Sequence, residues 1–273
     1  MSRRPTAVLA VLLALPLLAC AGLGGSPAKQ PTALERILAR GELRVGMSGE
    51  QPPLNMTTKR GELVGLEVAL ARVLARLIGV ELVLEPRPFA GLLGALEAGD
   101  IDLAMSGIAI TPQRNLRVAF VGPYYVSGKS LLTKSRELLA VKTPAELNRE
   151  GLRIVALAGS TSEAYVRRHM PRVELSTPIQ LSEAVRRVRE GEADALLADR
   201  ETCHFAALRH PGSGLRALGR PFTTEPIGIA LPPNEPQLVN LLDNYLRTLE
   251  GEGALARARD YWFENDDWID GLR

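Results

Sequence analysis

Cysteine and aromatic residues are scarce in this chain. Its 273 residues include two cysteines, Cys20 and Cys203, and 4% of the residues are aromatic. If Cys20 carries a lipid, as argued below, Cys203 has no partner within the chain, so no disulfide framework is available. We expect Cys203 to be a small buried apolar residue of a helix, with a reactive or ligand-facing thiol as the alternative.

The charges of the chain nearly cancel. Arg3 and Arg4 account for the formal charge of +2, so the rest of the chain carries equal numbers of basic and acidic residues. A nucleic-acid partner requires a basic surface, and this balance argues against one. The three histidines lie in arginine-rich helical segments without the spacing of metal ligands, and we predict neither a metal site nor a cofactor. These histidines are His169, His204 and His210.

The N-terminus has the features of a secretory signal peptide. A basic start precedes an apolar run that ends at Ala19 and is too short to span a membrane comfortably. Its last residues, Leu17-Leu18-Ala19-Cys20, resemble the lipobox of bacterial lipoproteins. We predict that residues 1–19 are removed and that Cys20 becomes an acylated membrane anchor, followed by a flexible tether to residue 31. A plain signal peptide with a soluble product is the alternative.

Two matching segments lie 92 residues apart, at 96–105 and 188–197. Each has the end of a helix, a glycine suited to a helix C-cap, an aspartate three residues later and an apolar strand. The same offset relates Gly107 to Asp199, each just beyond its strand. Ligands of open α/β sheets bind beyond the carboxyl ends of strands, so two such lobes would place Gly107 and Asp199 on opposite walls of one site. Chance similarity of two ordinary turns is the alternative.

Strands and helices alternate along the rest of the chain. Strands at 41–47 and 80–84 and helices at 66–78 and 89–98 form a βαβα pattern, which predicts a mostly parallel sheet. Extended segments at 120–128 and 221–228 are rich in Pro and Gly, as is typical of crossings between lobes. We therefore predict one lobe from residues 32–125 with 225–273, and a second from 126–224.

A strand at 153–158 followed by Gly159 and a helix capped by Ser160 is a good anion site. Unpaired N–H groups and the helix dipole favour negative charge at such a helix start. The alternative is that the hydroxyls only cap their helix. Thr111-Pro112 begins another helix by the same capping logic.

Three runs, at 61–67, 99–114 and 123–125, resemble the family 3 solute-binding proteins of ATP-driven importers. These are periplasmic or lipid-anchored receptors for polar amino acids and related solutes. The likeness covers nearly all of residues 32–270 and implies an α/β, periplasmic-binding-protein-like fold of type II, with two lobes joined by two hinge strands. It implies a monomeric receptor, not an enzyme, that captures a small solute by lobe closure and delivers it to a membrane permease.

The resemblance also implies the ligand-binding residues. Arg114, two residues after Thr-Pro, matches the arginine that binds the α-carboxylate of the ligand, and a planar guanidinium suits that group. Asp199 matches the acid that takes the ligand ammonium; a surface aspartate capping its helix is the alternative. The carbonyl of Gly107 and the N–H of Ala109 would complete the first wall.

Further residues belong to the predicted site. Ser160 and Thr161 would close on the carboxylate from the second wall, and Phe89 would stack on the ligand side chain or belong to the core. Gln51 stands where the family often has an aromatic residue, and Ser106 precedes Gly107. Ala109 stands where a Thr or Ser is frequent, and Leu157 replaces a polar residue. A solute with a carboxylate but a different second group is therefore an alternative to an amino acid.

Two other functions are considered. Cyclohexadienyl dehydratases resemble this family, and such an enzyme would need an acid such as Glu201 in the cleft. A sensory module is the third possibility, although we find no transmembrane or signalling segment after the lobes.

Overall fold

The computed structural model describes residues 31–264 and 268. The described residues from Thr32 onward belong to one compact unit. The predicted signal peptide and the lipidation site at Cys20 lie outside the described residues, and so does nearly all of the predicted tether. None of the described helices is long and apolar enough to cross a membrane.

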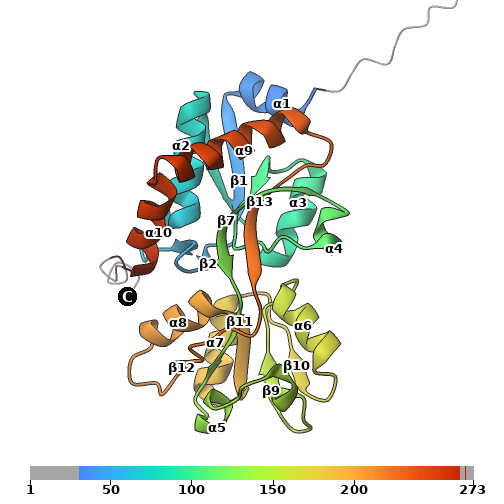
Figure 1. The fold of residues 1–273 in the computed structure, drawn as a ribbon, viewed down its shortest axis with the longest axis vertical. Coiled ribbons are helices and arrows are strands. Elements are labelled where there is room, and N and C mark those ends of the chain that lie inside the picture. The colour runs from blue at the N-terminus through green and yellow to red at the C-terminus, as the bar shows by residue number, and fades with distance from the viewer. Residues whose placement is uncertain (1–30, 265–267, 269–273) are drawn as a thin grey trace, which may run out of the picture. The chain divides into compact units, whose positions relative to one another are not determined.

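Two five-stranded sheets and a small three-stranded sheet organise the described residues (Figure 1). The first sheet has the order β5-β1-β6-β13-β7, formed by β5 (Glu81–Pro86), β1 (Glu42–Met47), β6 (Leu103–Ala104), β13 (Glu225–Leu231) and β7 (Ala119–Ser127). The second has the order β10-β9-β11-β8-β12, formed by β10 (Glu174–Ser176), β9 (Arg153–Val155), β11 (Ala195–Asp199), β8 (Lys129–Thr133) and β12 (Arg216–Ala217). The small sheet contains β2 (Glu50–Gln51), β3 (Asn55–Thr57) and β4 (Leu63–Val64).

The helices follow the periodicity and capping signals of the sequence. Thr32 and Thr111 cap the helices that follow them, and Pro112 occupies the first turn of its helix. The α-helices are α1 (Ala33–Arg40), α2 (Leu66–Ile78), α3 (Leu92–Ala98), α4 (Pro112–Asn115), α5 (Arg136–Leu139), α6 (Thr161–His169), α7 (Leu181–Glu190), α8 (Arg200–Arg209), α9 (Pro236–Gly251) and α10 (Ala254–Glu264). Short 3-10 helices lie at η1 (Phe89–Gly91) and η2 (Pro144–Leu147).

The expectation of a mostly parallel sheet is only half right. In the first sheet β1 is parallel to β5 and β6, and in the second β9 is parallel to β10 and β11. However, β13 is antiparallel to β6 and β7, and β8 is antiparallel to β11 and β12. The physical reason is the path of the chain, because the strands that carry it from one sheet to the other and back run against their neighbours.

The internal repeat is a structural one. Gly99 and Gly191 end α3 and α7 with φ of 77° and 80°, the left-handed conformation that a glycine adopts without strain. Each is followed by a central strand, β6 or β11. The repeated aspartates also have one role, because Asp102 accepts from the backbone N–H of Arg44 at 2.8 Å, and Asp194 from that of Arg153 at 2.8 Å. The match is therefore not a chance similarity of turns.

The long strands β7 and β13 lie side by side, with partners from Ala119↔Leu231 to Ser127↔Glu225 (Figure 1). Directly beyond Ser127, β8 begins in the second sheet. The predicted lobe limits, 125/126 and 224/225, fall within β7 and at the start of β13. These limits remain a prediction.

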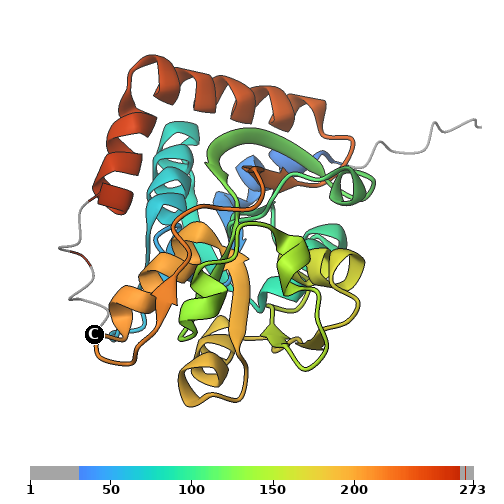
Figure 2. The ribbon, with the colours of Figure 1, turned by 60° about the horizontal axis from the view of Figure 1, so that its bottom comes forward.

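Separate hydrophobic clusters form on the two large sheets. One packs β1, β6 and β13 with α2 and α9, and two others cover the strands of the second sheet. The C-terminal helices belong to the first sheet, because α9 packs on β7 and α10 packs on α2 and α9 (Figure 2). Cys203 is fully buried in α8, and burial raises the pKa of its thiol, as expected of an inert core residue.

Candidate functional site

A small cavity brings together residues that are far apart in the sequence. Its volume is about 30 Å³, which is room for about two water molecules at roughly 10–15 Å³ each. Seven of the predicted site residues line it: Gln51 from the small sheet, Phe89, Gly107 and Arg114 from segments of the first sheet, and Ser160, Thr161 and Asp199 from segments of the second. The other lining residues are Leu157, Ser162, Leu181, Leu197, Ala198 and Thr202.

Arg114 lies on α4, which Thr111 caps. Its guanidinium donates to the carbonyl of Ala109 at 2.9 Å and to the carbonyl of Gly159 at 3.2 Å, and it lies 5.8 Å from the ring centre of Phe89. Partial burial lowers the pKa of Arg114, and the nearby carboxylate of Asp199 opposes this shift. A guanidinium is a cation in proteins, and this one is held in place by contacts to segments of both sheets.

Gly159 allows this close contact between the segments. Its φ is +74°, and a Cβ at this position would lie 3.0 Å from the Cα of Ala90 in the turn η1. Both the conformation and the space therefore favour glycine. The hydrogen bond from Arg114 to the carbonyl of Gly159 depends on this close contact between the segments.

Asp199 ends β11 and precedes α8. Although it occupies the N-cap position, its side chain makes no capping hydrogen bond, and it accepts no hydrogen bond from any residue that the structure describes. Its pKa is raised from 3.8 to about 7, mainly by desolvation and also by Glu225 and Glu201, whereas Lys129 and Arg114 oppose the rise. A helix-capping role is thus not supported, and an acid without a hydrogen-bond partner faces the cavity.

At the N-terminus of α6 the hydroxyls of Ser160 and Thr161 are engaged by the protein, whereas two backbone N–H groups are not engaged by any described residue. Ser160 Oγ accepts from the N–H of Glu163 at 3.1 Å and so caps the helix. Thr161 Oγ1 accepts from Lys129 Nζ at 2.7 Å and donates to Glu225 Oε2 at 2.8 Å. Among the described residues, the N–H groups of Thr161 and Ser162 have no acceptor. These groups and the helix dipole are suited to an anion.

A buried ion pair supports this helix start. Lys129 is 1% exposed, and its Nζ lies 2.7 Å from Glu225 Oε1. Thr223 Oγ1 also donates to Glu225, at 3.2 Å. Neither charge was singled out from the sequence. The available signal was their position, since Lys129 directly follows one crossing segment and Glu225 lies within the other. A charge in an apolar strand requires a partner.

Glu67 was also missed, although it belongs to one of the runs that carry the family resemblance. It is fully buried, and its carboxylate accepts from the N–H of Gly107 at 2.7 Å, from Asn55 Nδ2 at 2.5 Å and from the hydroxyl of Tyr124. Desolvation raises its pKa. These contacts fix the backbone at Gly107, which forms part of the cavity wall.

Two predicted site residues do not line the cavity. Ala109 lines a neighbouring pocket, and its carbonyl accepts from Arg114. Ser106 is fully buried, and its hydroxyl accepts from the N–H of Ser48 at 2.9 Å. Ser106 therefore supports the loop around Ser48 rather than the lining.

Glu201 also lies elsewhere. Its carboxylate accepts from the hydroxyl of Tyr125 at 2.6 Å, from Arg200 Nε at 2.8 Å and from the hydroxyl of Ser127, and it lines a different pocket. The acid that the dehydratase hypothesis requires is thus engaged outside the cavity. Within residues 31–264 and 268, no group of three or more His, Cys, Asp or Glu residues could hold a metal ion.

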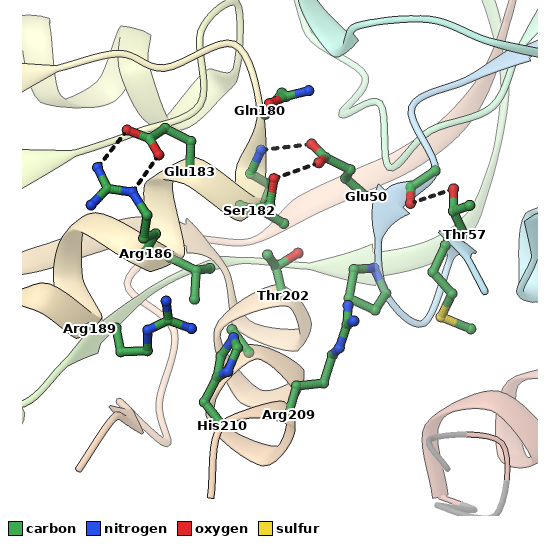
Figure 3. A pocket seen from close by; sticks show the side chains of 16 residues that line it. Glu50, Thr57, Gln180, Ser182, Glu183, Arg186, Arg189, Thr202, Arg209 and His210 are labelled. Carbon is green, nitrogen blue, oxygen red and sulfur yellow. Dashed lines mark hydrogen bonds and ion pairs between the residues drawn. The ribbon is translucent and has the colours of Figure 1, made fainter. Parts of the chain in front are cut away.

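A second pocket, of about 580 Å³, shares Leu181 and Thr202 with the cavity (Figure 3). Here Glu50 caps the start of α7 from the small sheet: its carboxylate accepts from the N–H of Leu181 at 2.7 Å and from the hydroxyl of Ser182 at 2.9 Å. The adjacent Gln51 Oε1 accepts from the hydroxyl of Thr202 at 3.4 Å. These contacts connect residues 131 and 151 positions apart in sequence, and they join β2 to α7 and α8.

A sequence model of the bacterial extracellular solute-binding proteins, family 3, matches residues 43–265. The chain belongs to this family. The L-cystine-binding protein TcyJ of Escherichia coli is 28% identical over 236 residues, which cover 85% of this chain and 86% of the relative. Cyclohexadienyl dehydratase of Pseudomonas aeruginosa is 27% identical over 253 residues, which cover 93% and 92%.

Solved structures agree with the family assignment. A putative binding component of an ABC transporter from Wolinella succinogenes, complexed with lysine, superposes with a TM-score of 0.79 at 34% identity and covers 85% of this chain and 99% of its own. The predicted family and the type II periplasmic-binding-protein fold are therefore confirmed. The relatives are mostly amino-acid-binding proteins of ABC importers, as the sequence predicted.

Proposed function

We propose that this protein is an extracytoplasmic receptor that binds an amino acid or a related carboxylate and delivers it to an ABC-type permease. One observation carries the proposal: Arg114 and Asp199, a cation and an anion from segments of different sheets, line one cavity. A zwitterion needs both. Relatives named for L-cystine and a lysine complex of a related structure support the same ligand class.

The proposed contacts follow the chemistry of the wall. The ligand carboxylate would accept two parallel hydrogen bonds from the guanidinium of Arg114, as well as the N–H groups of Thr161 and Ser162. The ligand ammonium would pair with Asp199, whose carboxylate accepts no hydrogen bond from any described residue. Binding the ammonium would also return Asp199 to its charged form, because a nearby cation lowers the pKa of an acid.

Entry of the ligand requires the walls to separate. The cavity has room for about two water molecules, whereas even the smallest amino acid has five non-hydrogen atoms. We infer that the walls separate about β7 and β13, and that the ligand closes them by interacting better with the closed state than with the open one.

The location of the receptor is part of the proposal. We infer that residues 1–19 are removed, that Cys20 carries the acyl anchor and that the monomeric receptor acts on the periplasmic or outer side of a membrane. Ala19 and Cys20 form the small-residue and cysteine ending of the lipobox-like run, which supports this inference.

A dehydratase is the second candidate, because one relative is a cyclohexadienyl dehydratase and the pKa of Asp199 lies near neutrality. We propose that the protein is not an enzyme, since the carboxylate of Glu201 is already engaged. Incubation with a hydroxycyclohexadiene carboxylic acid tests this, because loss of its hydroxyl as water and of its ring carboxyl as carbon dioxide forms an aromatic product with stronger ultraviolet absorbance. We expect no turnover, and a steady increase in absorbance would contradict the receptor assignment.

A thermal-shift screen against L-amino acids, amines and carboxylates tests the proposed function. A true ligand at 100 times its Kd adds about 2.7 kcal/mol to the free energy of unfolding, which is readily measured. Small-angle scattering with the best ligand should then give a smaller radius of gyration than without it. If no amino acid or carboxylate stabilises the protein, the proposal is wrong.

A further inference from the structure

The charges that line the cavity are few. Among its lining residues only Arg114 and Asp199 are charged, one of each sign. If the proposed function holds, the carboxylate and ammonium of the ligand use both of them. The wall then has no further charge for the ligand side chain.

The rest of the lining is neutral. Phe89, Leu157, Leu181 and Leu197 are apolar, and a charge buried against them without a counterion is costly. The amide of Gln51 and the hydroxyl of Thr202 are polar but uncharged. The Thr202 hydroxyl donates to Gln51 Oε1 at 3.4 Å, and the two residues are 4% and 7% exposed. An amide and a hydroxyl can both donate and accept, so they suit a neutral polar or apolar group.

Charges near the cavity are already engaged by the protein. Lys129 and Glu225 pair with each other at 2.7 Å, and both contact Thr161. Both carboxylate oxygens of Glu50, the acid beside Gln51, accept hydrogen bonds at the start of α7 (Figure 3). A charged ligand side chain would have to disrupt one of these arrangements.

We propose that this receptor selects a ligand whose side chain is uncharged, and that Gln51 and Thr202 determine this selectivity. The inference rests on the proposed function, because it assigns Arg114 and Asp199 to the carboxylate and ammonium of the ligand. It concerns only the lining residues other than Arg114 and Asp199.

Pairs of amino acids that differ in charge but hardly in shape test the proposal by calorimetry. Citrulline is compared with arginine, norleucine with lysine, and glutamine with glutamate. We expect the uncharged member to bind tighter in each pair in which binding is measurable, by about 100-fold or more, since an unpaired buried charge costs several powers of ten in affinity. Tighter binding of arginine than of citrulline overturns the inference but leaves the proposed function intact. If no compound of the three pairs binds, and the wider screen also fails, both are overturned.

A gain of specificity gives the sharper test. Gln51→Glu places an anion in the wall and should reverse the preference of the citrulline and arginine pair, whereas Gln237→Glu, on the exposed surface of α9, should leave it unchanged. If Gln51→Glu does not fold, Thr202→Asp places the same charge on the opposite wall. An unchanged preference in a folded variant shows that these residues do not determine selectivity, and overturns the proposal.

Discussion

Replacing Asp199 with Asn should stabilise the ligand-free protein while abolishing ligand binding. Burial raises the pKa of this carboxyl from 3.8 to about 7. The folded state thus binds the proton more tightly than the unfolded state, so stability is greatest at low pH and is lost as the pH rises from the unfolded pKa through the folded one. The site retains an acid whose charged form is unfavourable until a cation arrives.

The magnitude follows from the shift. At 1.36 kcal/mol per pKa unit, the charged carboxylate costs at most about 4 kcal/mol at pH 8 and roughly half a kcal/mol at pH 4. Asn has nearly the same shape and no charge. We expect Asp199→Asn to raise the free energy of unfolding at pH 8 by up to about 4 kcal/mol and to have little effect at pH 4.

Urea unfolding of both proteins between pH 4 and pH 8, without ligand, measures this difference. Other groups that titrate, such as Glu67, are present in both proteins and cancel. Asp260→Asn, at an exposed position of α10, is the control and should give a small difference at every pH. A variant at Asp199 that is less stable than the wild type at pH 8, or a difference that does not change with pH, would refute the reasoning.

The other predictions concern the ligand clamp, the contact at α7 and the anchor. Arg114→Ala should weaken ligand binding by at least about 100-fold in calorimetry, because it leaves the ligand carboxylate without its charged donor; wild-type affinity would contradict the clamp. Glu50→Gln should weaken ligand affinity by roughly 3- to 30-fold. The variant removes a charged acceptor at the start of α7, and this contact exists only when the two walls are closed on each other. Scattering should then show a more open particle at subsaturating ligand, and Glu62→Gln, an exposed residue, is the control. Cys20→Ser should release a soluble secreted protein on fractionation; recovery of the variant in the membrane pellet at the wild-type level would rule out acyl anchoring.

Local chemistry let the sequence predict several helix ends and the repeat, although the helix predicted at 89–98 begins with a 3-10 turn, and α3 itself starts at Leu92. Capping by Thr111 and the C-cap glycines Gly99 and Gly191 are decided by a few neighbouring residues, so they are visible in a short stretch of sequence. The repeat predicted Asp199 at the site, and the family resemblance added its role and Arg114; the structure places both residues in one cavity. These features need no knowledge of how distant segments meet.

Only the tertiary structure decided which polar groups are available to a ligand. Thr161 was predicted to contact the ligand carboxylate, but its hydroxyl serves the pair of Lys129 and Glu225, 32 and 64 residues away in sequence. Glu201, a candidate acid, is engaged by Tyr125, 76 residues away. Burial makes such long-range pairings obligatory, because an unpaired polar group inside a protein is costly, but the partner is chosen by the packing of the sheets and not by neighbours in the chain.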